Sequence, residues 1–329
     1  MAGQSWAISE DGGYLANPKL SKEARHATQP LMRFRQVTRV EPGFGKNSGD
    51  TLNFDKLSNV QTQGGPITEQ QDIPETKGLV RKGSLVVTEW GNSTPYTDKL
   101  ETLAEFDIDN IVHKWLVNDM AKTFDKAVAD TLRNGQITYV STGLTSQTWT
   151  FNGTAAATST SNFNYFHMKE IIDAMRTGFS GLSGTGNSIL PLTPVPPFPD
   201  GNYMAFLSVK AYRGLYDDPD FINAAKYSYP REYFYGELDE VVYNTRIIVS
   251  NNVNALSNLV GASTTTGEAI FIGDDSIAEG LVIKEELRAK LPVKYGRDKG
   301  LAWYGLLNFQ RIWDAIVDGE EHIVRFTSA

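Results

Sequence analysis

The most regular hydrophobic pattern in this chain runs from residue 98 to residue 134. Apolar residues recur there every third or fourth position along one stripe, which is the pattern of an amphipathic helix. Its large side chains Trp115, Met120 and Phe124 are expected to form the core beneath the helix. At a rise of about 1.5 Å per residue such a helix would be about 50 Å long, and the stripe keeps no strict heptad that would indicate a coiled coil. The pattern therefore predicts one long, solitary helix.

Strand-like runs precede this helix at residues 51–57 and 79–90, and the polar segment between them has Gly64-Gly65-Pro66 near its centre. A compact domain seldom carries a structureless loop of about 20 residues unless the loop is functional or disordered. We therefore expect a protruding hairpin over residues 51–97 that is ordered by contact with another subunit. The contact residues expected on it are Gln63, Ile67, Glu69, Ile73, Lys77, Arg81 and Lys82.

Residues 1–50 hold few apolar clusters and many glycines and prolines, which indicates an extended arm. Within the arm, Met32-Arg33-Phe34-Arg35 alternates with a period of two, as an extended segment lying on another surface would. Arg33 and Arg35 are therefore added to the expected subunit contacts. Two interpretations of this basic stretch stay open: a solvated strand face, or a clamp on an acidic neighbour or on packaged nucleic acid.

The remaining chain alternates helical and strand patterns, so the expected class is α+β. A helix is expected over residues 163–178 and short helical turns over 211–227, broken at Pro219. The expected strands lie at 203–209, 241–249, 269–272, 281–287, 301–317 and 322–326.

Composition narrows the possible functions. With 329 residues the chain is long enough for about two compact units. It contains no cysteine, which excludes disulfides and thiolate chemistry, and its formal net charge of −8 argues against a dedicated nucleic-acid reader. No secretory signal pattern and no apolar run long enough to cross a bilayer occur, so we expect no membrane contact.

No motif in the sequence carries recognisable chemistry. Residues 181–188 have the glycine spacing of a phosphate-binding loop, but Asn187 stands where the lysine belongs. The histidines are isolated from one another, and the acidic pairs Glu285-Glu286 and Glu320-Glu321 are expected to form solvated strand or turn faces. We therefore predict no catalytic residue, metal site or cofactor, and expect that the chain is not an enzyme.

Three segments resemble phage coat proteins: Leu57-Ser58-Asn59-Val60, Gly236-Glu237-Leu238 ahead of Arg246 to Ser250, and Lys294 to Asp298. The order of the predicted parts is also similar to the Hong Kong 97-type capsid fold of tailed-bacteriophage major capsid proteins, encapsulins and the herpesvirus capsid floor. The resemblance implies an N-terminal arm (1–50), an E-loop hairpin (51–97), a spine helix with P-domain strands (98–163), an A domain (164–275) and closing P-domain strands (276–329).

The same resemblance implies a function. Copies of the chain would form pentamers and hexamers of an icosahedral shell around double-stranded DNA, without sequence-specific contact. A scaffolding protein, a portal and cement proteins would be its partners, and the virion capsid, assembled in the host cytoplasm, its location. Two alternatives remain: an encapsulin-like compartment, and a phage tail or carbohydrate-binding module, which the aromatic run Tyr233-Phe234-Tyr235 would suit.

Overall fold

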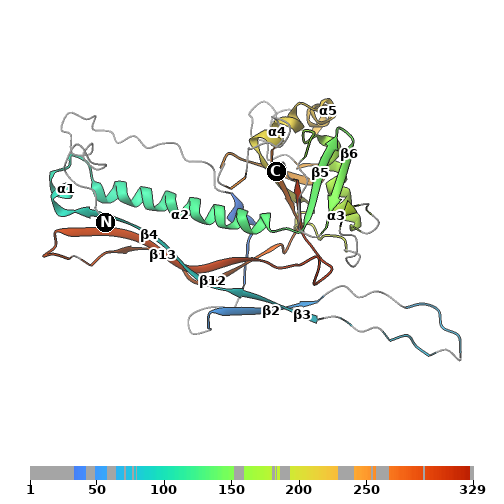
Figure 1. Ribbon diagram of the computed structural model, residues 1–329, viewed down its shortest axis with the longest axis horizontal. Helices are drawn as coiled ribbons and strands as arrows, with labels where there is room; N and C mark the ends of the chain where they lie inside the picture. Colours follow the sequence, from blue (N-terminus) through green and yellow to red (C-terminus); the bar gives the residue numbers. More distant parts are fainter. Residues whose placement is uncertain are drawn as a thin grey trace.

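The chain folds into an elongated body with a projecting hairpin (Figure 1). The computed structural model describes residues 33–41, 49–57, 64–69, 72–75, 78, 80–151, 159–179, 182, 184–185, 193–228, 241–252, 255–256, 267–291 and 293–326. A long helix lies lengthwise over one sheet, and a second sheet with its own helices stands at one end of that helix. Among the described residues, no helix is both long enough and apolar enough to cross a membrane.

The predicted helix over residues 98–134 is two helices, α1 (Asp98–Leu103) and α2 (Ile108–Arg133). The chain leaves helical geometry at Ala104, and the side chain of Asp107 then accepts a hydrogen bond from the backbone N–H of Asn110. This is the bond of a helix N-cap, so a new helix starts there. With 26 residues, α2 is about 39 Å long.

The buried stripe of α2 follows every fourth residue: Ile108, Val112, Leu116, Phe124, Val128 and Leu132 are all buried. Because four residues turn a helix by slightly more than one revolution, each step moves the stripe about 40° around the axis. The stripe thus winds away from Trp115, whose side chain is 40% exposed. The prediction that Trp115 is a core residue is wrong; Phe124 is buried, and Met120 is half-buried against the core.

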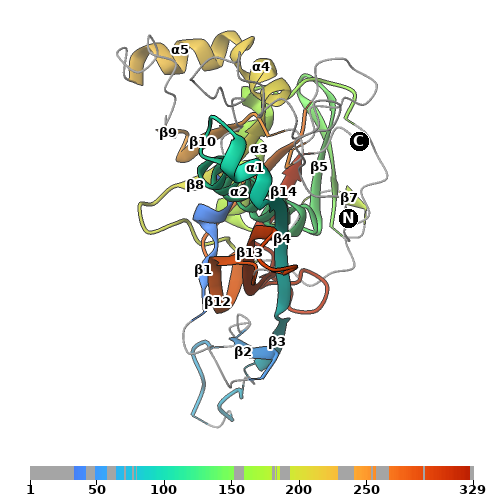
Figure 2. The same ribbon diagram turned by 90° about the vertical axis from the view of Figure 1, so that its left-hand side faces the viewer.

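The helix α2 covers a four-stranded sheet in the order β1-β12-β13-β4. Alternate residues of these strands face opposite sides: Trp303 and Leu307 pack under α2, whereas Ala278 and Leu306 face the hairpin. Seen end-on, the sheet separates α2 from the hairpin (Figure 2). The strands are β1 (Arg39–Val40), β12 (Ile277–Ala289), β13 (Asp298–Arg311) and β4 (Thr88–Thr97).

The second sheet has eight strands in the order β7-β6-β5-β14-β11-β8-β10-β9. Its central strand β8 serves two cores, because Ala205 and Leu207 face α3 and α4 while Phe206 stacks on Phe34 at a ring distance of 4.4 Å. The strands are β5 (Ile137–Gly143), β6 (Ser146–Thr150), β7 (Gly184–Thr185), β8 (Tyr203–Ser208), β9 (Val241–Val242), β10 (Thr245–Ser250), β11 (Ala269–Ile272) and β14 (Ile323–Phe326). The helices are α3 (Tyr165–Thr177), α4 (Val209–Tyr216) and α5 (Pro219–Ser228).

This sheet crosses the expected domain boundaries. The resemblance implies P-domain strands within residues 98–163, where β5 and β6 lie, and within 276–329, where β14 lies. All three lie in the eight-stranded sheet, where β6 pairs with β7 and β14 pairs with β11, both of them strands of the segment 164–275. Periodicity identifies a strand but not its partners, since these come from distant parts of the chain.

The hairpin consists of β2 (Thr51–Leu57) and β3 (Val80–Val86), paired from Thr51↔Val86 to Leu57↔Val80. The ring of Phe54 lies over Gly83, where a Cβ atom would be 2.3 Å from the ring, so a larger residue at this position would have to displace Phe54. A small core with Leu85 and Ile312 attaches the hairpin to the four-stranded sheet. The hairpin ends at Val86 and not at residue 97, because β4 joins that sheet instead.

Candidate functional site

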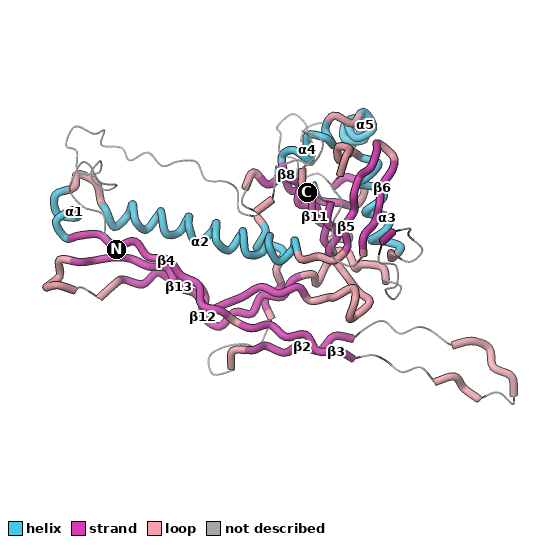
Figure 3. Tube along the Cα trace, in the orientation of Figure 1, coloured by secondary structure: helices cyan, strands magenta, loops and turns pink. Residues whose placement is uncertain are grey.

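The hairpin exposes aliphatic side chains that no other part of the described chain covers. Leu57 and Val80, the last pair of the ladder, are 72% and 59% exposed. Farther out, Ile67 and Ile73 are 47% and 73% exposed, and Figure 3 shows the described pieces of this segment beyond the ends of both strands. An isolated two-stranded hairpin is marginally stable in water, and exposed apolar patches mark interaction sites. The hairpin is therefore a surface that needs a partner.

At the opposite end of the long axis, the turn between β12 and β13 forms a second exposed apolar tip. Leu291 is 86% exposed and Tyr295 is fully exposed. Lys294 and Tyr295 both have left-handed backbones, with φ of 52° and 60°, and a Lys294–Asp298 ion pair of 2.9 Å spans the turn. This surface is not among the predicted contacts, although the alternation of Leu291, Val293 and Tyr295 between turn residues is a signal for it in the sequence.

The hairpin root, which we define as the cross-strand partners Lys56 and Arg81, is held by one buried carboxylate. Lys56 is buried; its Nζ donates to Asp318 Oδ2 and, at 3.1 Å, to the carbonyl oxygen of Ile312. The Nε of Arg81 lies 4.0 Å from Asp318 Oδ1. Charges buried in this way are stabilising only while they stay paired. Lys56 is therefore tied within its own subunit.

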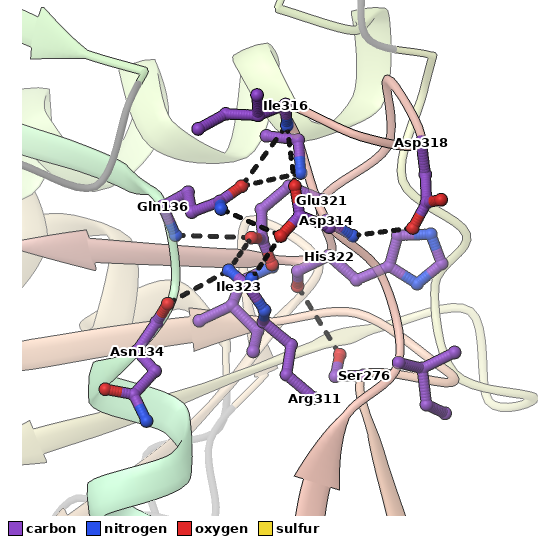
Figure 4. Close-up of polar contacts among 12 residues, drawn as sticks. Asn134, Gln136, Ser276, Arg311, Asp314, Ile316, Asp318, Glu321, His322 and Ile323 are labelled. Carbon is purple, nitrogen blue, oxygen red and sulfur yellow. Dashed lines mark hydrogen bonds and ion pairs between the residues drawn. The ribbon is translucent and has the colours of Figure 1, made fainter. Parts of the chain in front are cut away.

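Asp318 belongs to the junction turn, residues 312–322, which links the two sheets (Figure 4). Arg311 donates from Nη1 to Glu321 Oε2 at 2.8 Å and to the carbonyl oxygen of Asn134, the last residue of α2's cap, at 2.9 Å. Its Nη2 donates to Asp314 Oδ2 at 2.9 Å. Gln136, just before β5, donates from Nε2 to the same Asp314 oxygen at 3.0 Å. One guanidinium therefore fastens the end of α2 to both sheets.

The expectation that Glu320 and Glu321 form a solvated face is wrong, because both are buried. Burial raises the pKa of Glu321 to about 7, against the opposing effect of Arg311. His322 is also buried, and this lowers its pKa. The sequence does contain a partner for Glu321, namely Arg311 ten residues earlier. The two residues form an ion pair because the connection between β13 and β14 folds back on itself.

The described part of the arm is bound to its own chain. Arg35 donates from Nη1 to Glu285 and from Nη2 to Glu279, both at 2.7 Å, and its guanidinium carbon lies 5.1 Å above the Phe124 ring. Arg35 therefore has acidic partners within its own subunit, and its contact with a neighbouring subunit stays a prediction. The segment is also not an extended strand: Phe34–Val37 form the 3-10 turn η2, anchored by the Phe34 N–H donating to Asp125 Oδ1 at 2.9 Å.

The other predicted contact residues lie on the hairpin, except Arg33, which stands just before η2 in the arm. Glu69 and Lys82 are exposed, Arg81 and Arg33 are half-buried, and Gln63 and Lys77 lie outside the described residues, as does the aromatic run 233–235. Within the described ranges, no group of three or more His, Cys, Asp or Glu side chains is placed to hold a metal ion.

His167 on α3 is a buried titratable group in the core of the second sheet, where its Nδ1 shares a 2.7 Å hydrogen bond with the Tyr139 hydroxyl. Burial lowers the pKa of His167 from 6.5 to about 4. Below about pH 6.5 the unfolded chain takes up this proton first. We therefore expect the free energy of unfolding to fall by up to about 3 kcal/mol, for this group alone, as the pH drops from about 6.5 to 4.

Denaturant titrations of unassembled subunits between pH 7 and pH 4 would measure this effect. The variant His167→Gln, which keeps a polar side chain at Tyr139 but cannot be protonated in this range, should show a flatter dependence. Equal slopes for both proteins would contradict the prediction.

Comparison with known proteins identifies similar chains. The model of the Phage capsid family matches residues 12–180, just over half of the chain. Among solved structures, an acid-stable capsid of Helicobacter pylori bacteriophage KHP30 is 13% identical with a TM-score of 0.69, over 98% of both chains. The cyanophage Pam1 capsid is 16% identical with a TM-score of 0.65 over 100% of both, and the capsid of Ralstonia phage GP4 is 13% identical with 0.64 over 99% of both. No curated protein sequence matches this chain.

Proposed function

This chain belongs to the phage capsid family and is a coat protein of the virion shell, and from that premise we propose how its copies join. The hairpin of one subunit buries its exposed aliphatic side chains on the next subunit. These contacts occur within pentamers and hexamers that tile an icosahedral shell around double-stranded DNA. The observation that carries this proposal is the apolar hairpin itself. Leu57, Val80 and Ile73 are more than half exposed in the subunit. Nothing in the described part of the chain covers them, so burial on a neighbouring subunit would remove them from water.

The positions of the exposed surfaces favour head-to-tail contacts. The hairpin and the β12–β13 tip project at opposite ends of the long axis. A contact between two different surfaces of identical copies repeats around a rotation axis and closes rings. Rings of five and of six copies could then share the same surfaces, with small differences in angle between neighbours.

The remaining parts of the proposal concern partners. A formal charge of −8 supports a shell that confines DNA without binding its sequence, since affinity for phosphates would require a basic surface. A scaffolding protein, a portal and cement proteins would act with it during assembly in the host cytoplasm. The role needs no catalytic step, so we propose that the chain is not an enzyme.

Replacing the exposed pair at the end of the hairpin ladder tests the proposed contact. The double variant Leu57→Ser, Val80→Ser should reduce the yield of particles by tenfold or more, as seen by sedimentation and negative-stain microscopy, because each removed side chain forfeits about 1–2 kcal/mol of burial at every contact. The subunit itself should fold normally, since both positions are exposed in it.

Leu144 provides the matched control. It is 71% exposed, close to the value for Leu57, but lies on the turn between β5 and β6. Leu144→Ser should leave the particle yield unchanged. Normal particles from the hairpin variant, or equal losses in both variants, would refute the hairpin contact.

A further inference from the structure

The hairpin root and the junction turn both donate hydrogen bonds to the same oxygen atom. Asp318 Oδ2 accepts a hydrogen bond from Lys56 Nζ and another, at 3.0 Å, from the backbone N–H of Asp314. The side chain of Asp318 is fully buried, and that of Lys56 is 8% exposed. Solvent therefore screens this contact little. Both hydrogen bonds, from Lys56 and from the Asp314 N–H, are lost if this oxygen moves.

From Asp314 the contacts continue to both sheets. Its Oδ2 accepts from Arg311 at the end of β13 and from Gln136 before β5. Its Oδ1 accepts from the backbone N–H groups of Ile316 and Val317, at 2.9 and 2.8 Å, which fixes the shape of the turn. A displacement of Asp318 would thus disturb Asp314, the residue whose carboxylate holds the turn and the two sheets together.

The other oxygen of Asp318 is unused. Asp318 Oδ1 and Arg81 Nε are both buried, and neither has a hydrogen-bond partner among the described residues. They face each other at 4.0 Å, about 1 Å beyond hydrogen-bonding distance. Buried polar atoms are normally bonded, and a shift of the hairpin root by about 1 Å would bring Arg81 within hydrogen-bonding distance of the carboxylate.

We propose that Asp318 couples the position of the hairpin root to the order of the junction turn, so that a displacement of the hairpin is transmitted to the place where the two sheets meet. The coupling is a property of the single subunit and does not depend on which surface the hairpin contacts. In a shell it would let a neighbour that holds the hairpin influence the angle between the sheets.

Hydrogen exchange of purified, unassembled subunits, followed by mass spectrometry of peptides, tests the coupling without any need for shells. Lys56→Met removes the cation from the root. Exchange should then accelerate about tenfold in β2 and β3 and also in residues 312–322, although the substitution lies in the hairpin. The control is Lys82→Met, the same change at the exposed neighbour of Arg81, which should alter neither region.

Acceleration confined to the hairpin in Lys56→Met would overturn the proposal, because the two regions would then be independent. If this variant fails to fold, Arg81→Met decides the question, since it leaves the Lys56–Asp318 bond intact. It should accelerate exchange about two- to threefold in residues 312–322. Unchanged exchange in that turn would overturn the coupling.

Discussion

Replacing residues 58–79 by Asn-Gly should abolish shell formation and leave a folded subunit. The substitution joins Leu57 to Val80, which are already paired across the ladder, through a dipeptide that suits a two-residue hairpin turn. The small core that includes Leu85 and Ile312 stays intact, and so does the contact of Lys56 with Asp318. Only the outer part of the hairpin, with Ile67 and Ile73, is lost.

The expected loss is large because the proposed hairpin contact would be repeated by every subunit of the shell. Size-exclusion chromatography and negative-stain microscopy should show subunits or small oligomers in place of uniform particles. Circular dichroism and a denaturant midpoint close to those of the full chain would confirm that the subunit still folds. Particles of normal size from the shortened chain would show that assembly uses other surfaces.

Phe124→Ala should lower the free energy of unfolding of the subunit by about 3–5 kcal/mol. The ring of Phe124 is buried, lies 5.4 Å from Trp303 and 6.3 Å from Phe309 in edge-on contacts, and supports the guanidinium of Arg35. Its removal leaves a cavity where α2, the sheet and the arm meet. Denaturant titration of unassembled subunits measures the loss.

Trp115→Ala is the matched comparison on the same helix. Because Trp115 is 40% exposed, its truncation should cost only about 1–2 kcal/mol, although the side chain is larger than that of Phe124. Equal losses for the two variants would mean that the winding of the buried stripe does not govern the stability of α2.

The sequence predicts individual elements better than their associations. A helix was expected over residues 98–134 from its apolar stripe, and α2 occupies most of that span. The break before it depends on one local bond, between Asp107 and the N–H of Asn110, which apolar spacing does not reveal. The exposure of Trp115 follows from the winding of the stripe, a geometric effect that three- and four-residue spacing alone does not resolve.

The contacts of the candidate site depend still more on pairs of residues that are far apart in the sequence. Ile67 and Ile73 were expected on a protruding hairpin because the polar segment is too long for a compact domain, and both are exposed. Arg35, in contrast, has partners about 250 positions away along the chain, and Lys56 meets Asp318 across a similar separation. No local pattern marks such pairs, since the strand order of the sheets creates them.

The strand order of the eight-stranded sheet makes its closure depend on a strand that comes late in the chain. The last strand of the described chain, β14, does not lie at an edge but in the middle, between β5 and β11. A nascent chain that still lacks residues 323–326 has two half-sheets with facing, unpaired edges. Such edges invite pairing with other chains. The ribosome therefore has to deliver β14 before this half of the molecule can close, and chaperones that shield the two edges during that interval would raise the yield of soluble subunits.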